Sequence, residues 1–219
     1  MSATAAPYGL RPVNLIGGQP YAGSTRSIKI ASGYAANIFY GDPVYIHSDG
    51  TLRKAVVTTS VTTPATSGVV GVFVGCAYTD PNLKIPVYKQ YWPTGTVASD
   101  AYAYVVDDPD VVFQVQADGT VPQTALGNNI ALNSASGDTQ TGNSTTSAVY
   151  NSYDVTATLP LRIVGFVEST TSTVGDAYTD LLVKWNMPNA VSTTTPSSGT
   201  ATTTTALVGG HAYLNPVGF

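Results

Sequence analysis

Charge is scarce in this chain. Only 10% of its 219 residues are charged, against ~25% in typical soluble domains, and Ser, Thr, Gly, Tyr and Asn take their place. The net charge of −4 contains no basic cluster, because the nine Lys and Arg residues are scattered and only Arg53 and Lys54 are adjacent. Nucleic acid is therefore not expected as a partner. A neutral, hydroxyl-rich surface instead suggests extensive contacts with other proteins.

Cysteine is almost absent. Cys76 is the only one, so no internal disulfide can form and the fold suits a reducing cytoplasm. Neither His47 nor His211 belongs to a companion motif, so we expect Cys76 to be a small buried hydrophobe and not a catalytic thiol. The same lack of partners argues against a zinc site, and no cofactor is expected.

Long apolar runs are missing as well. No stretch approaches the ~18 consecutive apolar residues that cross a bilayer. The start, MSATAAPYGL, has neither the basic residues nor the apolar core of a secretory signal. We therefore expect no membrane partner, and a chain that is cytoplasmic when it is made or is exported by a route other than the general secretory one.

Helical periodicity is also missing, whereas short strand-like runs are frequent. With 21 glycines, 14 prolines and a single glutamate, the sequence opposes long helices. Only residues 124–133 could form a short helix. Alternating or apolar runs bounded by turn residues predict strands at 26–31, 42–47, 52–57, 68–79, 101–106, 111–116, 153–168 and 179–186. Asp-Gly turns at 49–50 and 118–119 fit tight hairpins, and the pattern predicts an all-β fold with a small barrel or sandwich core.

Composition divides the chain into four parts. We expect an extended N-terminal arm over 1–24, an all-β core domain over 25–190, a Ser/Thr-rich linker over 191–205 and an apolar C-terminal tail over 206–219. The apolar groups of the two ends need burial. A neighbouring subunit and the chain's own core explain the composition equally well. The residues predicted to contact a partner are Tyr8, Leu10, Pro12, Val13 and Leu15 in the arm, and Leu207, Tyr213, Leu214 and Phe219 in the tail.

Three carboxylates gather around a proline in the stretch Asp107-Asp108-Pro109-Asp110. Their spacing does not match a calcium-binding loop. Neighbours on a proline turn also lack the separation that an acid and base pair needs. We interpret the stretch as a corner between two strands. Because nucleophile and phosphate-binding motifs are absent too, no catalytic residue is expected and the chain is not predicted to be an enzyme.

Aromatic residues are the remaining signal. Fourteen tyrosines are present, and Tyr88, Tyr91 and Trp92 lie close together in VYKQYWPTG. Such residues suit either a protein interface or a platform for sugar rings. A tail or fibre module that binds host surface glycan is therefore an alternative to a protein-binding function.

Several motifs, taken in order, resemble those of a known group of proteins. The most specific are APYGLRPV at 6–13, GDPV at 41–44 with SDGTL at 48–52, and DDPDVVFQVQADG at 107–119. Others are GGQPYAG, VVGVFVG, LPLRIVGFVES and DLLVKWN. Together they cover residues 5 to 190 and resemble the capsid decoration, or cement, proteins of tailed bacteriophages.

The resemblance implies a virion structural protein with no enzymatic activity. It implies an all-β core with an extended arm, bound to the outer surface of an icosahedral shell, where it bridges neighbouring subunits of the major capsid protein. Homo-oligomers are expected, with a trimer favoured over a dimer, and the chain would pass through the host cytoplasm during assembly. The acidic balance suits the outside of a shell better than a lining that faces DNA.

Overall fold

The computed structural model describes residues 4–55, 69–133, 136–155, 159–170, 172–186, 189–197 and 200–208. In these residues nearly all regular structure is β, and the one helix is a short 3₁₀ turn at Gln123–Ala125. The predicted all-β fold is confirmed, with a sandwich-like core. None of the helical structure in this part of the chain has the length and apolarity that a membrane crossing requires.

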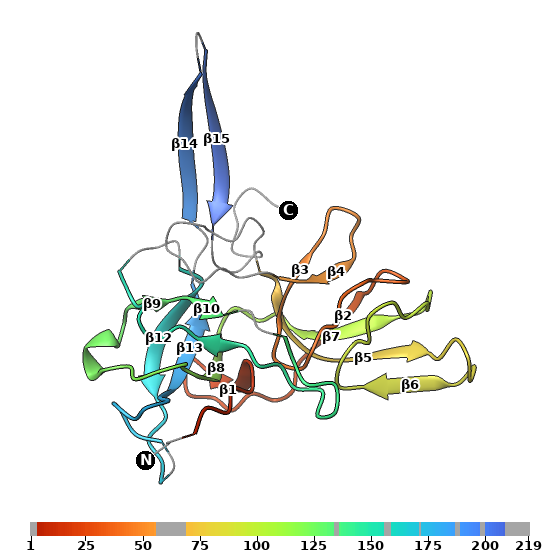
Figure 1. The fold of residues 1–219 in the computed structure, drawn as a ribbon, viewed down its shortest axis with the longest axis horizontal. Helices are drawn as coiled ribbons and strands as arrows, with labels where there is room; N and C mark the ends of the chain where they lie inside the picture. The colour runs from red at the N-terminus through yellow and green to blue at the C-terminus, as the bar shows by residue number, and fades with distance from the viewer. Residues whose placement is uncertain are drawn as a thin grey trace.

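Two antiparallel sheets form the body of the protein (Figure 1). The five-stranded sheet has the order β1 (Arg11–Leu15), β8 (Val111–Gln116), β13 (Asp180–Trp185), β12 (Leu161–Phe166) and β9 (Asn129–Ile130). The six-stranded sheet has the order β2 (Arg26–Lys29), β7 (Tyr102–Val106), β5 (Gly71–Thr79), β3 (Pro43–Ile46) and β4 (Leu52–Lys54), with β6 (Pro86–Lys89) also paired to β5. Two smaller pairs are β10 (Leu132–Asn133) with β11 (Ser147–Ala148), and β14 (Asn189–Ser197) with β15 (Thr200–Val208).

Each strand range expected from the sequence contains an observed strand, and the run VVFQVQ coincides with β8. The segment 124–133, where a short helix is expected, is helical only at its start, in the 3₁₀ turn Gln123–Ala125, and then holds β9 and β10. Gly127 interrupts any helix there, and the backbone of Asn129 and Ile130 pairs with β12. Tertiary pairing thus outweighs a weak helical preference.

Each sheet has its own apolar core. In the core of the five-stranded sheet, Phe113 and Trp185 meet edge to face, with their ring centroids 6.1 Å apart. Trp92 and Tyr78 meet in the same way in the core of the six-stranded sheet, at 5.4 Å. Val72 and Val106 belong to the six-stranded sheet but pack in the core of the five-stranded sheet. The two halves therefore share apolar contacts and do not form separate domains.

A buried carboxylate lies where the two halves meet. Asp42 has no exposed surface. Its Oδ2 accepts the Phe39 N–H at 2.9 Å and pairs with Lys54 Nζ at 2.8 Å, while Oδ1 accepts the Ser144 hydroxyl at 2.5 Å. The Thr146 hydroxyl donates to the same Oδ1 at 3.4 Å. These partners come from segments far apart in sequence, so the carboxylate fixes how the segments meet.

Two glycines allow the chain to cross close to this carboxylate. Gly41 has a φ of +89°, and a Cβ there would lie 2.9 Å from the Leu10 nitrogen. Gly9 has a φ of +75°, and a Cβ there would lie 2.9 Å from Ser144 Cβ. Only glycine combines this backbone conformation with so close an approach. The two glycines belong to APYGLRPV and GDPV, so these motifs form one structural unit.

The Thr-rich segment at 191–205, expected to be a linker, is instead a hairpin. β14 and β15 pair along their whole length, from Asn189 opposite Val208 to Ser197 opposite Thr200. In Figure 1 the hairpin stands away from both sheets. Threonine is β-branched and favours strands, which is why a segment with the composition of a linker is paired here.

We expect Asp42→Ala to lower the free energy of unfolding by about 3 to 5 kcal/mol, because it removes the buried carboxylate that Lys54 and two buried hydroxyls share. Urea denaturation measures this change. Asp110→Ala is the matched control, since it breaks an ion pair with Lys184 in which the aspartate side chain is 63% exposed. The control should cost less than about 1 kcal/mol. Equal losses in the two variants would contradict the role of Asp42.

Candidate functional site

The aspartates at 107–110 form the corner between β7 and β8, and thus join the two sheets. Asp108 Oδ1 accepts the Asp110 N–H at 2.9 Å, which closes the turn. Asp107 pairs with Arg26 Nε at 2.6 Å and Asp110 pairs with Lys184 Nζ at 2.9 Å. Asp107 thus binds β2 of the six-stranded sheet, and Asp110 binds β13 of the five-stranded sheet. The prediction of a strand corner is confirmed.

His47 lies at the end of β3, where a tight turn leads to β4. Its ring Nδ1 is 3.2 Å from Asp49 Oδ2, and its backbone N–H donates to the Thr51 carbonyl. Hydrogen bonds from the Thr51 hydroxyl and N–H lower the pKa of Asp49. The cluster therefore stabilises the turn. No group of three or more potential metal ligands occurs in the part of the chain that the structure describes.

The predicted contact residues of the N-terminal arm lie on the chain's own five-stranded sheet. Leu10, predicted to contact a partner, is instead fully buried in the protein's own core, because the crossing at Gly9 and Gly41 directs it inward. Leu15 and Pro12 are half-buried, and Pro12 is tolerated because β1 is an edge strand. Val13 is the extra residue of a β-bulge opposite β8 and is 44% exposed.

Tyr8 anchors the start of this arm. Its hydroxyl donates to Asp180 Oδ1 at 2.8 Å, and its ring receives the Arg11 guanidinium at 4.4 Å. The Ala6 N–H donates to Gln116 Oε1 at 2.8 Å. The segment is extended, as expected, but from Ala6 onward it docks on its own sheet. Of the two burial partners that the composition allows, the structure supplies the chain's own core for this end.

The C-terminal contact residues are only partly within the described chain. Leu207 lies in β15, where its backbone is opposite Ala190. Tyr213, Leu214 and Phe219 lie outside the described residues. Contacts of this end with a partner stay a prediction.

The aromatic platform expected at Tyr88, Tyr91 and Trp92 does not assemble. Trp92 is fully buried. Tyr91 stacks on Phe39 at 5.5 Å between ring centroids. Tyr88 alone points to solvent, with 75% of its surface exposed. Alternation separates Tyr88 from Tyr91, and the bend at residues 90–91 after β6 brings Trp92 to a bridge with Ile38.

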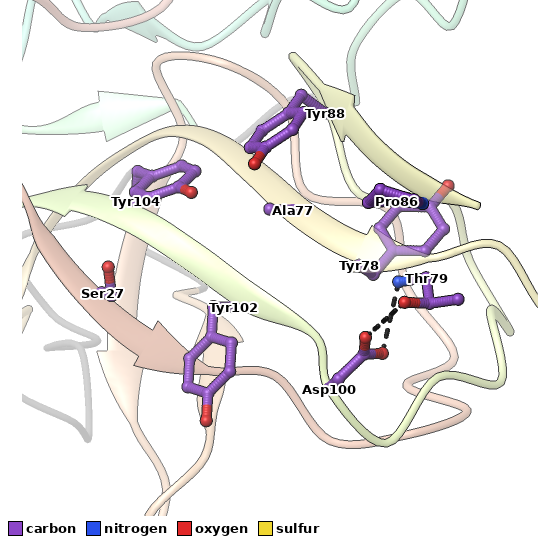
Figure 2. A pocket seen from close by; sticks show the side chains of 9 residues that line it. All are labelled: Ser27, Ala77, Tyr78, Thr79, Pro86, Tyr88, Asp100, Tyr102 and Tyr104. Atoms are coloured by element: carbon purple, nitrogen blue, oxygen red, sulfur yellow. Dashed lines mark hydrogen bonds between the residues drawn. The ribbon is translucent and has the colours of Figure 1, made fainter.

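Tyr88 instead lies on one surface with two tyrosines of β7. Figure 2 shows the rings of Tyr88 and Tyr104 near Ala77 and the ring of Tyr102 pointing away from it, with Asp100 and Thr79 joined by hydrogen bonds. We call this surface the tyrosine hollow, and it is lined by Ser27, Ala77, Tyr78, Thr79, Pro86, Tyr88, Asp100, Tyr102 and Tyr104. Its volume is about 370 Å³, at the low end of the ~300–1,000 Å³ of ligand pockets.

The strand register builds the hollow. Ala77 on β5 pairs with Tyr88 of β6 on one side and with Tyr102 of β7 on the other. Cross-strand partners share a face of a sheet. Tyr104 follows two residues after Tyr102 on the same face and pairs with Gly75. Small residues therefore form the floor between tyrosine walls.

Asp100 is held at the rim of the hollow. The Thr79 hydroxyl donates to Oδ2 at 2.6 Å and the Thr79 N–H donates to Oδ1 at 3.2 Å. These bonds lower the pKa of Asp100, so it is ionised at neutral pH. Sequence analysis missed this site, since Asp100, Tyr102 and Tyr88 meet only through strand pairing. The alternation AYAY at 101–104 was the one available signal.

Alkaline pH should weaken the docking of the N-terminal arm. Burial, with the charge of Asp180, raises the pKa of the Tyr8 phenol above its ordinary value of 10.0. Unfolding then releases a proton above about pH 10, so the free energy of unfolding should fall as pH rises through that range. We expect Tyr8→Phe to cost about 1 to 2 kcal/mol at pH 7 and to make this fall shallower in urea titrations at pH 8 to 11. An unchanged slope would contradict the assignment to Tyr8.

Cys76 should be unreactive in the folded protein. The thiol is buried and donates to the Tyr91 carbonyl at 3.4 Å, and burial raises its pKa to about 12. Because the thiolate is the nucleophile, we expect an aromatic disulfide reagent at pH 8 to label the native protein at least about a hundredfold more slowly than the urea-unfolded protein. Rapid labelling of the native protein would show an accessible thiol.

The chain was also compared with known proteins. No protein-family model, curated protein or solved structure matches it.

Proposed function

We propose that the protein is a virion structural protein that decorates the outer surface of a bacteriophage capsid and bridges neighbouring major capsid protein subunits. The sequence motifs support this, because APYGLRPV and GDPV resemble those of decoration proteins and pack together at the crossing of Gly9 and Gly41. The low charge of the chain also fits a protein with extensive contacts.

The observation that carries the bridging function is a pair of separate apolar surfaces. One is made by Val13 and Ile16, at β1 and just after it, and both are exposed. The other is made by Leu83, Ile85 and Val97 at the far end of the six-stranded sheet, and these are exposed too. Pro81 and Asn82, in the turn before Leu83, line another hollow of the surface together with Val97.

The positions of the two surfaces suit a bridge. β1 and the turn between β5 and β6 lie apart in Figure 1. A protein that links two shell subunits needs contact areas in two places, and exposed aliphatic groups contribute most when a partner covers them. Repetition over a lattice then multiplies each weak contact by avidity.

Self-association into a trimer is part of this proposal. Sedimentation of the purified protein measures the oligomer directly.

The proposed location on the outside of the shell rests on the net charge of −4, since an acidic protein is repelled by DNA.

Binding to shells tests the proposal. We expect the purified protein to bind expanded shells that lack it, to bind immature shells less, and to raise the force needed to break the expanded ones. Binding to neither kind of shell would overturn the proposal.

A triple variant, Leu83→Ser with Ile85→Ser and Val97→Ser, should weaken binding to expanded shells by about 3 kcal/mol, or roughly a hundredfold. Val155→Ser is the control, because Val155 is 83% exposed and lies outside both surfaces. Full occupancy by the triple variant would exclude this end of the sheet as a contact.

A further inference from the structure

The tyrosine hollow has the features of a small-ligand site that capsid binding does not explain. Tyr88 and Tyr102 are exposed although they are large aromatic groups. Between them Ala77 leaves the floor open. A second hollow of about 440 Å³ shares Tyr88 and Tyr104 and extends past Gln90. The two hollows lie on either side of Tyr88 and Tyr104, which line both.

The polar groups of the hollow define the class of ligand. Among the described residues that line it, Asp100 is the only acidic or basic side chain, and the hydroxyls of Ser27, Thr79 and the tyrosines supply the other polar atoms. Because Lys89 lines the second hollow and not this one, the tyrosine hollow itself does not suit phosphates or other anions. Aromatic faces beside hydroxyls and a carboxylate suit a ligand with both C–H faces and hydroxyl groups.

The carboxylate of Asp100 is oriented for this purpose. Thr79 uses one hydrogen bond on each oxygen. A carboxylate accepts about four hydrogen bonds, so lone pairs on both oxygens remain for ligand hydroxyls. Thr79 thus fixes the orientation of the Asp100 side chain, and both carboxylate oxygens can still accept hydrogen bonds from a ligand.

The floor strand β5 cannot take an extended peptide as an added strand, whereas, among the described strands, β2 and β6 at the sides of the hollow each have an open edge. That mode of binding needs an unpaired sheet edge. At Ala77, β5 is paired on both sides, with β6 and with β7. A ligand over Ala77 therefore meets side chains only.

We propose that the tyrosine hollow binds a neutral saccharide, with a sugar ring lying over Ala77 against the tyrosine rings and its hydroxyls donating to Asp100. This site contains none of the exposed aliphatic residues assigned to the capsid contact, although Tyr78 lines both it and the hollow beside Val97. It also differs from the platform expected at Tyr91 and Trp92, which are not on this surface.

A printed array of neutral oligosaccharides of glucose, galactose, mannose and N-acetylglucosamine tests the proposal on the full-length protein. We expect saturable binding to a subset, confirmed in solution by saturation-transfer NMR with the best glycan. Binding to none of these glycans would overturn the proposal.

Variants separate the site from the fold. Tyr88→Ala and Tyr102→Ala should each weaken binding roughly tenfold, and Asp100→Asn by about tenfold. Ala77→Val keeps every wall residue and favours the strand, but fills the floor and should abolish binding. Tyr150→Ala, which removes an exposed tyrosine elsewhere, should have no effect.

The melting temperature of each variant reports its folding. If Ala77→Val and Tyr88→Ala melt as the unchanged protein does and still bind the glycan, the hollow is not the site. Because isolated protein is used, this result does not depend on binding to shells, and either proposal can fail without the other.

Discussion

The burial of one carboxylate organises this protein. Asp42 is buried away from water, and an unpaired charge in the protein interior would be prohibitively costly. Its four partners must therefore be brought to it. They come from the segment before β3, from β4 and from residues 144–146. The crossing of Gly9 and Gly41 lies against the same residues. The N-terminal arm, the six-stranded sheet and the 144–146 segment therefore share one point of closure.

Strand positions followed from local pattern, whereas the pairing partners did not. Alternation located β8, and proline with aspartate located the corner before it. β1 was not expected because Pro12 argues against a strand, and only its edge position makes it compatible with one. The hairpin at 189–208 was hidden by low complexity, since composition alone does not distinguish a flexible threonine tract from a paired one.

The site was harder to predict than the fold, for a physical reason. Tyr88 and Tyr102 line one hollow only because both pair with Ala77 in the register of three strands, and register is set by long-range pairing. Proximity in sequence pointed instead to Trp92, whose side chain fills the core. Apolar residues near the N-terminus were correctly expected to need burial, but sequence could not choose between the chain's own sheet and a partner.

The docking of the arm has a consequence for biosynthesis. Tyr8 is held by Asp180 and Ala6 by Gln116, partners 172 and 110 positions further along the chain. The arm cannot take its native place until both partners have been synthesised. Closure of the five-stranded sheet is therefore a late event with high contact order, which favours slow folding. Until then its apolar groups remain open to chaperones.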